Sequence, residues 1–182
     1  EDEPWERGSY TKENFARITN KAFDVFLNGV SDYLFFFDTD QTCGPDAVER
    51  LLDLDEPTAG LVIRTSPNAG IYNFLGTADV CEPGKPCYDR NSLKRREDIF
   101  KPVYPKFAPT GPFRVGFVSG AVLLRRAIVH MVRASKTHPN WEWGSVWDEV
   151  RRRRIPGPMI EPRGETAHYM KQGEPPLVYK PA

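Results

Sequence analysis

The sequence has no apolar run near the roughly 18 residues that a membrane-spanning helix needs, so we expect no transmembrane segment. Its three cysteines include no CxxC pair, which argues against a disulfide framework and a structural zinc site. Lys and Arg number 25 and so do Asp and Glu, a balance that argues against a general nucleic-acid binder. The first residues, EDEPWERGSY, lack the basic and apolar regions of a secretory signal, which predicts a cytoplasmic address, free or peripheral to a membrane.

Three common motifs of enzymes are also missing. The chain has no glycine-rich dinucleotide fingerprint, no P-loop and no nucleophile signature of a Ser–His–Asp hydrolase. It does have 17 prolines and 14 glycines among its 182 residues, so we expect many turns and long ordered loops. A chain of this length is typical of one domain.

Hydrophobic spacing predicts an α/β domain with a mixed, mainly parallel sheet flanked by helices. The DYLFFFDTD segment contains five consecutive apolar or aromatic residues, which is typical of a strand covered on both faces in the middle of a sheet. We assign one domain to residues 1–182, with a core over 12–170, a long loop over 77–112 and a Pro-rich tail over 171–182. The expected helices lie at 11–27, after Pro45, at 127–134 and at 141–154, and the expected strands at 33–37, 59–66, 70–76, 113–126 and 159–161.

Asp38 and Asp40 are the sharpest chemical feature of the sequence. They stand directly after the apolar strand, at the edge of a sheet where α/β proteins bind ligands. Two like charges in such a place need a cation or hydrogen-bond donors beside them, and oxygen ligands select hard ions such as Mg²⁺ or Mn²⁺. The alternative is an acidic turn in which Asp40 or Thr42 caps the helix behind Pro45.

His168 is a candidate third metal ligand from a distant segment, because neutral imidazole binds Mn²⁺. A lone histidine in such a segment is more often a surface or core residue than a ligand, and only its pairing with the aspartates favours the metal site. Asp148 and Glu149 follow three tryptophans, and a carboxylate buried there would suit a general base. The alternative for this pair is a solvated helix face whose carboxylates form charge pairs with the four arginines that follow.

Small residues interrupt the otherwise bulky segment FRVGFVSGAVLLRR. Gly120 and Ala121 belong to this group, together with Gly116 and Ser119. Glycine weakens a strand, so it often marks a place where another group closely approaches the backbone, such as a sugar. A β-bulge would need the same glycines.

In this order, these features resemble a nucleotide-sugar glycosyltransferase of the GT-A fold, family 2-like. The resemblance rests on DYLFFFDTD, a helix begun by proline, AGLVIRTS, VGFVSGAVLLRR, a Trp-containing segment with an acidic pair, and a late histidine. It covers about residues 12–170. The family normally opens with a strand–helix–strand unit that binds the nucleotide base, and this sequence begins too late to hold all of it.

The resemblance also implies roles for individual residues. Asp38 would lie near the nucleotide ribose and the metal, while Asp40 and His168 would ligate Mn²⁺ or Mg²⁺. Gly120 and Ala121 would border the donor sugar. Asp148, or as second choice Glu149, would be the base of an inverting reaction.

We therefore expect a metal-dependent glycosyltransferase that moves a sugar from a nucleotide-diphosphate donor to an acceptor hydroxyl on a glycan, a lipid-linked molecule or a protein. The alternatives are a noncatalytic carbohydrate- or partner-binding domain of the same fold, and a nucleotidyltransferase, which would also use paired aspartates and Mg²⁺. No nucleic-acid partner is expected.

Overall fold

A computed structural model describes residues 12–64, 74–77, 111–137, 141–169 and 173–180. Its helices are α1 (Lys12–Asn28), α2 (Ala47–Asp53), α4 (Arg126–Met131) and α5 (Trp141–Arg152). Its strands are β1 (Tyr33–Phe37), β2 (Gln41–Cys43), β3 (Thr58–Leu61), β4 (Phe74–Thr77), β5 (Phe113–Val118), β6 (Ala121–Arg125), β7 (Met159–Glu161), β8 (Thr166–His168) and β9 (Leu177–Tyr179). The predicted bounds of β1 and β7 are confirmed, and those of α1 differ by one residue at each end.

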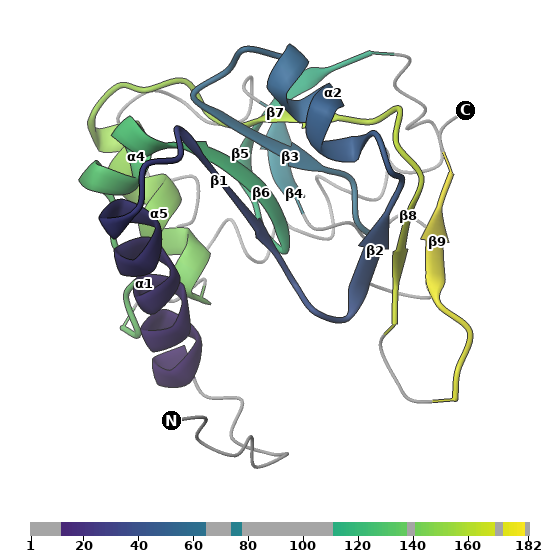
Figure 1. Ribbon diagram of the computed structural model, residues 1–182, viewed down its shortest axis with the longest axis horizontal. Helices are drawn as coiled ribbons and strands as arrows, with labels where there is room; N and C mark the ends of the chain where they lie inside the picture. Colours follow the sequence, from purple (N-terminus) through teal and green to yellow (C-terminus); the bar gives the residue numbers. More distant parts are fainter. Residues whose placement is uncertain (1–11, 65–73, 78–110, 138–140, 170–172, 181–182) are drawn as a thin grey trace.

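The chain forms one mixed α/β domain, but its main sheet is mostly antiparallel (Figure 1). Six strands lie in the order β1-β6-β3-β7-β5-β4, and only the pair β3–β7 runs parallel. The prediction of a mainly parallel sheet was therefore wrong. The physical reason is that β6 lies between β1 and β3 and pairs antiparallel with both, a strand order that hydrophobic spacing does not encode.

Helices cover both faces of this sheet. On one face α1, α4 and α5 bury a cluster that includes Phe23, Trp143 and Trp147, and Phe36 of β1 packs against it. On the other face Leu51 of α2 lies in a second cluster, to which β1 contributes its odd-numbered aromatic residues. Both faces of β1 are thus packed against apolar clusters, as expected, although all five of its residues are only partly buried. Its expected place in the middle of the sheet is wrong, because among the described strands β1 pairs only with β6 and forms an edge.

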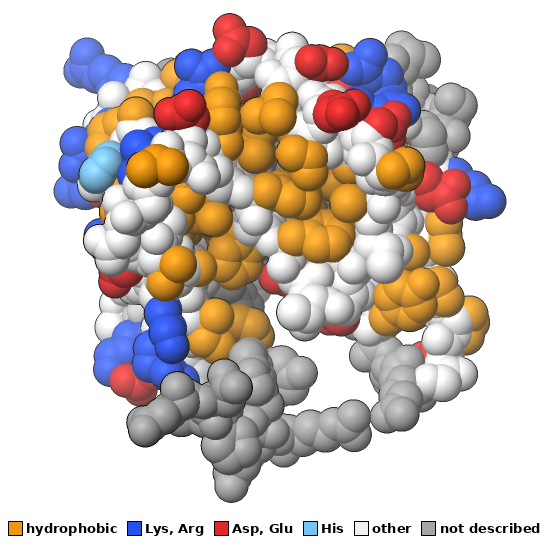
Figure 2. Space-filling view, in the orientation of Figure 1, with side chains coloured by type: hydrophobic (Ala, Val, Ile, Leu, Met, Phe, Trp, Pro, Cys, Tyr) orange, Lys and Arg blue, Asp and Glu red, His pale blue; other side chains and the backbone are white. Residues whose placement is uncertain are grey.

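The buried stripe of α2 is narrower than predicted. Ala47 and Leu51 are buried, whereas Val48 and Leu52 are each 39% exposed. Figure 2 shows hydrophobic side chains gathered over β1 and α2 on this face of the molecule. No helix in the part of the chain that the structure describes is long and apolar enough to cross a membrane.

Three strands that the sequence analysis did not predict, β2, β8 and β9, form a second sheet in which β8 pairs with each of the other two. β2 occupies part of the segment expected to be an acidic turn, and β9 lies inside the expected Pro-rich tail. The tail is anchored by Tyr179, whose hydroxyl donates to the Pro162 carbonyl at 2.8 Å. Most of the predicted 77–112 loop, with Cys81 and Cys87, lies outside the described residues; Cys43 is a free thiol, and burial raises its pKa.

Glu161 ends β7 as a fully buried carboxylate. Arg163 donates to its two oxygens from Nε at 2.8 Å and from Nη2 at 2.6 Å, and its backbone N–H donates at 2.8 Å. Burial raises the pKa of Glu161, but these bonds and the charge of Arg50 lower it further than burial raises it. The ion pair thus keeps the buried group charged.

Acid should therefore destabilise the fold through Glu161. Because its folded pKa lies below the unfolded value of 4.5, its contribution to stability is complete above that value and is lost as the pH falls through the folded pKa. Arg163→Met should lower the free energy of unfolding at neutral pH by about 2 kcal/mol, since a buried carboxylate loses its partner, and should flatten the acid dependence. Urea denaturation at stepped pH measures both effects; a variant as stable as the wild type would contradict them.

Candidate functional site

The predicted aspartates lie in the connection from β1 to β2, which is bonded to two other segments (Figure 1). The Asp38 N–H donates to the Gly120 carbonyl at 2.9 Å, and the Gln41 N–H closes the turn onto the Asp38 carbonyl at 3.2 Å. On the other side, the Tyr169 N–H donates to the Asp40 carbonyl at 2.7 Å. The backbone of the turn is therefore attached to the start of β6 and to the end of β8.

The second sheet brings His168 to Asp40 across 128 positions of sequence. β2 pairs antiparallel with β8 so that Gln41 faces His168, which places the imidazole beside the residue that precedes Gln41. The distance between Asp40 Oδ2 and His168 Nε2 is 3.4 Å. The His168 side chain is 12% exposed and that of Asp40 is 51% exposed, so the pair opens toward solvent on its carboxylate side.

The other ring nitrogen of His168 determines what this pair can do. Nδ1 lies 3.1 Å from the Arg64 carbonyl, which only accepts hydrogen bonds, so Nδ1 carries a proton. In the neutral ring, Nε2 then presents a lone pair to the carboxylate of Asp40. Two acceptors at this distance are stable only with a proton or a cation between them. A histidine that donates its other N–H to a backbone carbonyl is the usual arrangement of a metal ligand.

The separation fits a shared ion. Two ligands on bonds of about 2.1 Å stand about 3.0 Å apart at a right angle and about 3.4 Å apart at a tetrahedral angle. Within the described ranges, however, no three His, Cys, Asp or Glu side chains are grouped so that they could hold a metal, so the predicted three-ligand set is not assembled there. Mg²⁺ is commonly held by one or two carboxylates together with the phosphates of a substrate. Two protein ligands are therefore enough for a site that a substrate completes.

Asp38 lies beside Gln41 and Gly120. Gln41 Nε2 donates to Asp38 Oδ2 at 3.3 Å. Gly120 has a φ of +78°, and a Cβ built on it would stand 2.7 Å from Gln41 Nε2 and 3.0 Å from Asp38 Oδ2. The groups that approach this glycine are therefore side chains of the site itself, and the close approach predicted for a sugar is already made by them.

Ala121 follows Gly120 and pairs with Phe37 of β1. Its side chain is fully buried in the cluster under α2. Only its backbone is placed near the turn, and its predicted contact with a donor sugar stays a prediction.

Asp148 and Glu149 lie on α5, where they form ion pairs with arginines at the end of the helix and in the turn that follows it. Asp148 pairs with Arg151, and Glu149 pairs with Arg152 and Arg153. This arrangement matches the charge-paired alternative considered for the acidic pair. Their predicted role as catalytic base stays a prediction.

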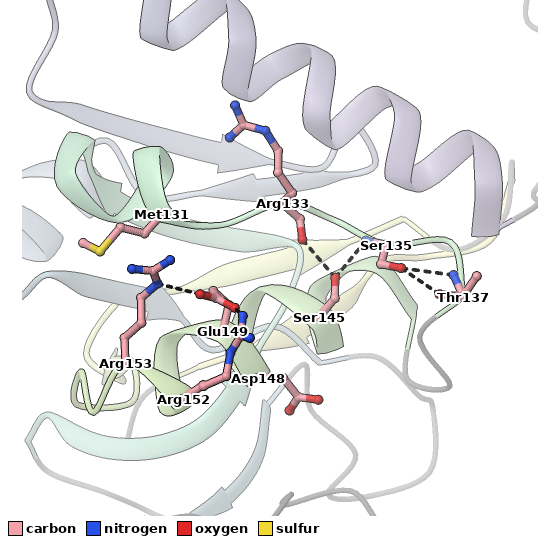
Figure 3. A pocket seen from close by; sticks show the side chains of 9 residues that line it. All are labelled: Met131, Arg133, Ser135, Thr137, Ser145, Asp148, Glu149, Arg152 and Arg153. Carbon is pink, nitrogen blue, oxygen red and sulfur yellow. Dashed lines mark hydrogen bonds and ion pairs between the residues drawn. The ribbon is translucent and has the colours of Figure 1, made fainter.

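The two carboxylates also line a hollow of about 670 Å³ (Figure 3). Its lining residues come from α4, the segment between α4 and α5, α5 itself and the turn after it: Met131, Arg133, Ser135, Thr137, Ser145, Asp148, Glu149, Arg152 and Arg153. In Figure 3 the Asp148 carboxylate points away from the cluster of Glu149 with Arg153. Neither Asp40 nor His168 lines this hollow.

The sequence analysis missed Gln41. It follows Asp40 directly, but glutamine has no special place in the residue patterns that indicate a metal or sugar site. Its importance depends on β2, a strand of three residues that is too short for a period-of-two pattern. The Arg64 carbonyl was also missed, because backbone groups leave no signal in a sequence.

No family model matches this chain, and no curated protein matches it. Among solved structures, the chain is similar to the crystal structure of A197 from STIV, with a TM-score of 0.57 and 11% sequence identity. The match covers 92% of this chain and 76% of that one. At this identity the likeness concerns the fold alone.

Proposed function

We propose that this chain is a metal-dependent glycosyltransferase of the GT-A type, or the larger part of one, which transfers a sugar from a nucleotide-diphosphate donor to an acceptor hydroxyl. The observation that supports it most is the pair formed by Asp40 Oδ2 and His168 Nε2, 3.4 Å apart, with the imidazole oriented by the Arg64 carbonyl. A cation between them would satisfy both groups. A resident Mn²⁺ or Mg²⁺ would stabilise the negative charge that develops on the leaving diphosphate.

The residues at and beside the turn would have different roles in binding the ion and the donor. Asp40 and His168 would hold the ion from two sides, and the half-exposed carboxylate of Asp40 leaves room for phosphate oxygens of the donor. Asp38, held by Gln41 and by the Gly120 carbonyl, would face the ion and the nucleotide ribose. Gly120 would contribute by leaving space for these side chains.

Deprotonation of the acceptor hydroxyl would need a carboxylate, for which Asp148 is our first choice and Glu149 our second. Either residue would have to exchange its arginine partner for the acceptor. The acceptor oxygen, once this carboxylate takes its proton, would attack from the face opposite the leaving diphosphate, which gives inversion at the anomeric carbon. The acceptor would be a glycan, a lipid-linked molecule or a protein, and the proposed compartment is the cytoplasm.

A screen of nucleotide sugars tests the proposal without knowledge of the acceptor. The wild-type protein should hydrolyse at least one donor slowly in the presence of Mn²⁺ or Mg²⁺, and EDTA should stop the reaction. Release of UDP or GDP is the measurement. Turnover that is insensitive to EDTA would contradict the role of a metal.

Thermal stability separates catalysis from binding. UDP or GDP at one hundred times its dissociation constant should add about 2.7 kcal/mol to the free energy of unfolding, and should do so only with Mn²⁺ present. Stabilisation without turnover of any donor would favour the noncatalytic domain of the same fold. If the protein showed no stabilisation by the nucleotides and no turnover of any donor, both functions would be contradicted.

A further inference from the structure

Gln41 is a buried polar side chain inside the candidate site. It is 8% exposed, and it lies at the first position of β2, opposite His168. Its Nε2 donates to Asp38, while its Oε1 is buried and has no hydrogen-bond partner among the described residues. A buried acceptor without a partner lowers the stability of the fold, so Gln41 does not contribute to stability through its Oε1.

The orientation of the amide follows from its neighbour. With Nε2 toward Asp38 Oδ2, the amide donates a hydrogen bond to the carboxylate. The flipped amide would set one oxygen against another, which an ionised Asp38 does not tolerate. The amide therefore holds one oxygen of the Asp38 carboxylate.

Gly120 is adapted to the same amide. Its φ of +78° and the 2.7 Å approach of Gln41 Nε2 both exclude a side chain at this position without a shift of the amide. Two residues from two segments, Gln41 and Gly120, thus serve the placement of the Asp38 carboxylate.

We propose that Gln41 is a positioning residue that holds Asp38 for the cation and the nucleotide diphosphate. This inference rests on the proposed function, because it assigns Asp38 to the site described above. Residues that orient metal ligands are needed for affinity, and their loss commonly weakens metal binding by about ten- to a hundredfold.

Gln41→Met is the sharpest test, since it keeps the volume of the side chain but removes both the donor and the unpartnered acceptor. The affinity of the full chain for Mn²⁺ in the presence of UDP should fall about tenfold in a calorimetric titration. The Tm without ligand should stay equal or rise. Gln41→Leu should behave in the same way and guards against an effect peculiar to methionine.

Thr58→Val is the matched control. Thr58 is also fully buried, and its Oγ1 also lacks a hydrogen-bond partner among the described residues. It pairs with Leu124, at the opposite end of β6 from Gly120. This variant should keep the Tm or raise it, and should leave the affinity for Mn²⁺ unchanged.

The outcomes separate the two claims. Weaker Mn²⁺ binding by Gln41→Met at an undiminished Tm supports the positioning role. Unchanged affinity, whatever happens to the Tm, overturns it and leaves the proposed function standing. A wild-type protein that binds no Mn²⁺ with UDP removes the proposed function, and the positioning role with it.

Discussion

Asp40→Asn should lower the rate of metal-dependent donor hydrolysis about a thousandfold, which corresponds to about 4 kcal/mol of transition-state stabilisation. Asparagine keeps the size of the side chain but carries no charge, and its amide nitrogen cannot serve as a ligand. Its neutral carbonyl oxygen would hold a divalent ion more weakly than the carboxylate does. The measurement is kcat/KM for nucleoside diphosphate release at saturating Mn²⁺.

The fold itself should be unaffected by this change, because the Asp40 side chain is 51% exposed. What the turn needs from this residue is its carbonyl, which accepts the Tyr169 N–H and is retained in the variant. Glu49→Gln, which removes an exposed carboxylate from α2, is the control and should keep the wild-type rate. Equal rates for Asp40→Asn and the wild type would mean that no catalytic cation is held at this turn.

Gly157→Ala should cause the largest loss of stability of any substitution considered, about 3 kcal/mol or more. A Cβ at this position would stand 2.2 Å from the Val115 carbonyl oxygen, far inside van der Waals contact. The obstacle is backbone of β5, so no side chain can rotate away to relieve it. Urea denaturation followed by circular dichroism gives the change.

The neighbouring contacts make this backbone difficult to move. The Val115 N–H donates to the Pro158 carbonyl at 3.0 Å, and Arg114 Nη1 donates to the Gly157 carbonyl at 2.6 Å. A shift that makes room for a methyl group would strain both bonds and the pairing of β5 with β7. Gly164→Ala is the control, since a Cβ there meets no heavy atom within 4 Å, and it should change stability by less than about 0.5 kcal/mol. Similar losses in both variants would contradict the steric explanation.

Much of the local structure follows from the order of residues. The apolar run Tyr33–Phe37 has high β propensity, and it forms β1 with the bounds that its composition predicts. The helical spacing of Phe15, Ile18, Ala22 and Val25 predicts α1, although Val25 itself is 67% exposed. The position of the two aspartates directly after a strand is also a property of the sequence alone.

The directions of the strands and the pairing partner of β1 cannot be predicted from the order of residues. A side chain alternates between faces in the same way whether its strand pairs parallel or antiparallel, so the pattern of β6 carries no sign of its two antiparallel neighbours. In the same way, the charge of Glu161 predicts exposure, and only its contact with Arg163 explains how it is buried.

The sequence by itself therefore determined which residues could bind a cation: two aspartates after β1 and a histidine far along the chain. Only the tertiary structure decided which of them meet. The pairing of β2 with β8 sets His168 beside Asp40, and the Arg64 carbonyl selects the ring nitrogen that faces it. These contacts depend on strand register and on backbone groups. Backbone groups are the same in nearly every residue type, so the sequence does not indicate which of them will meet.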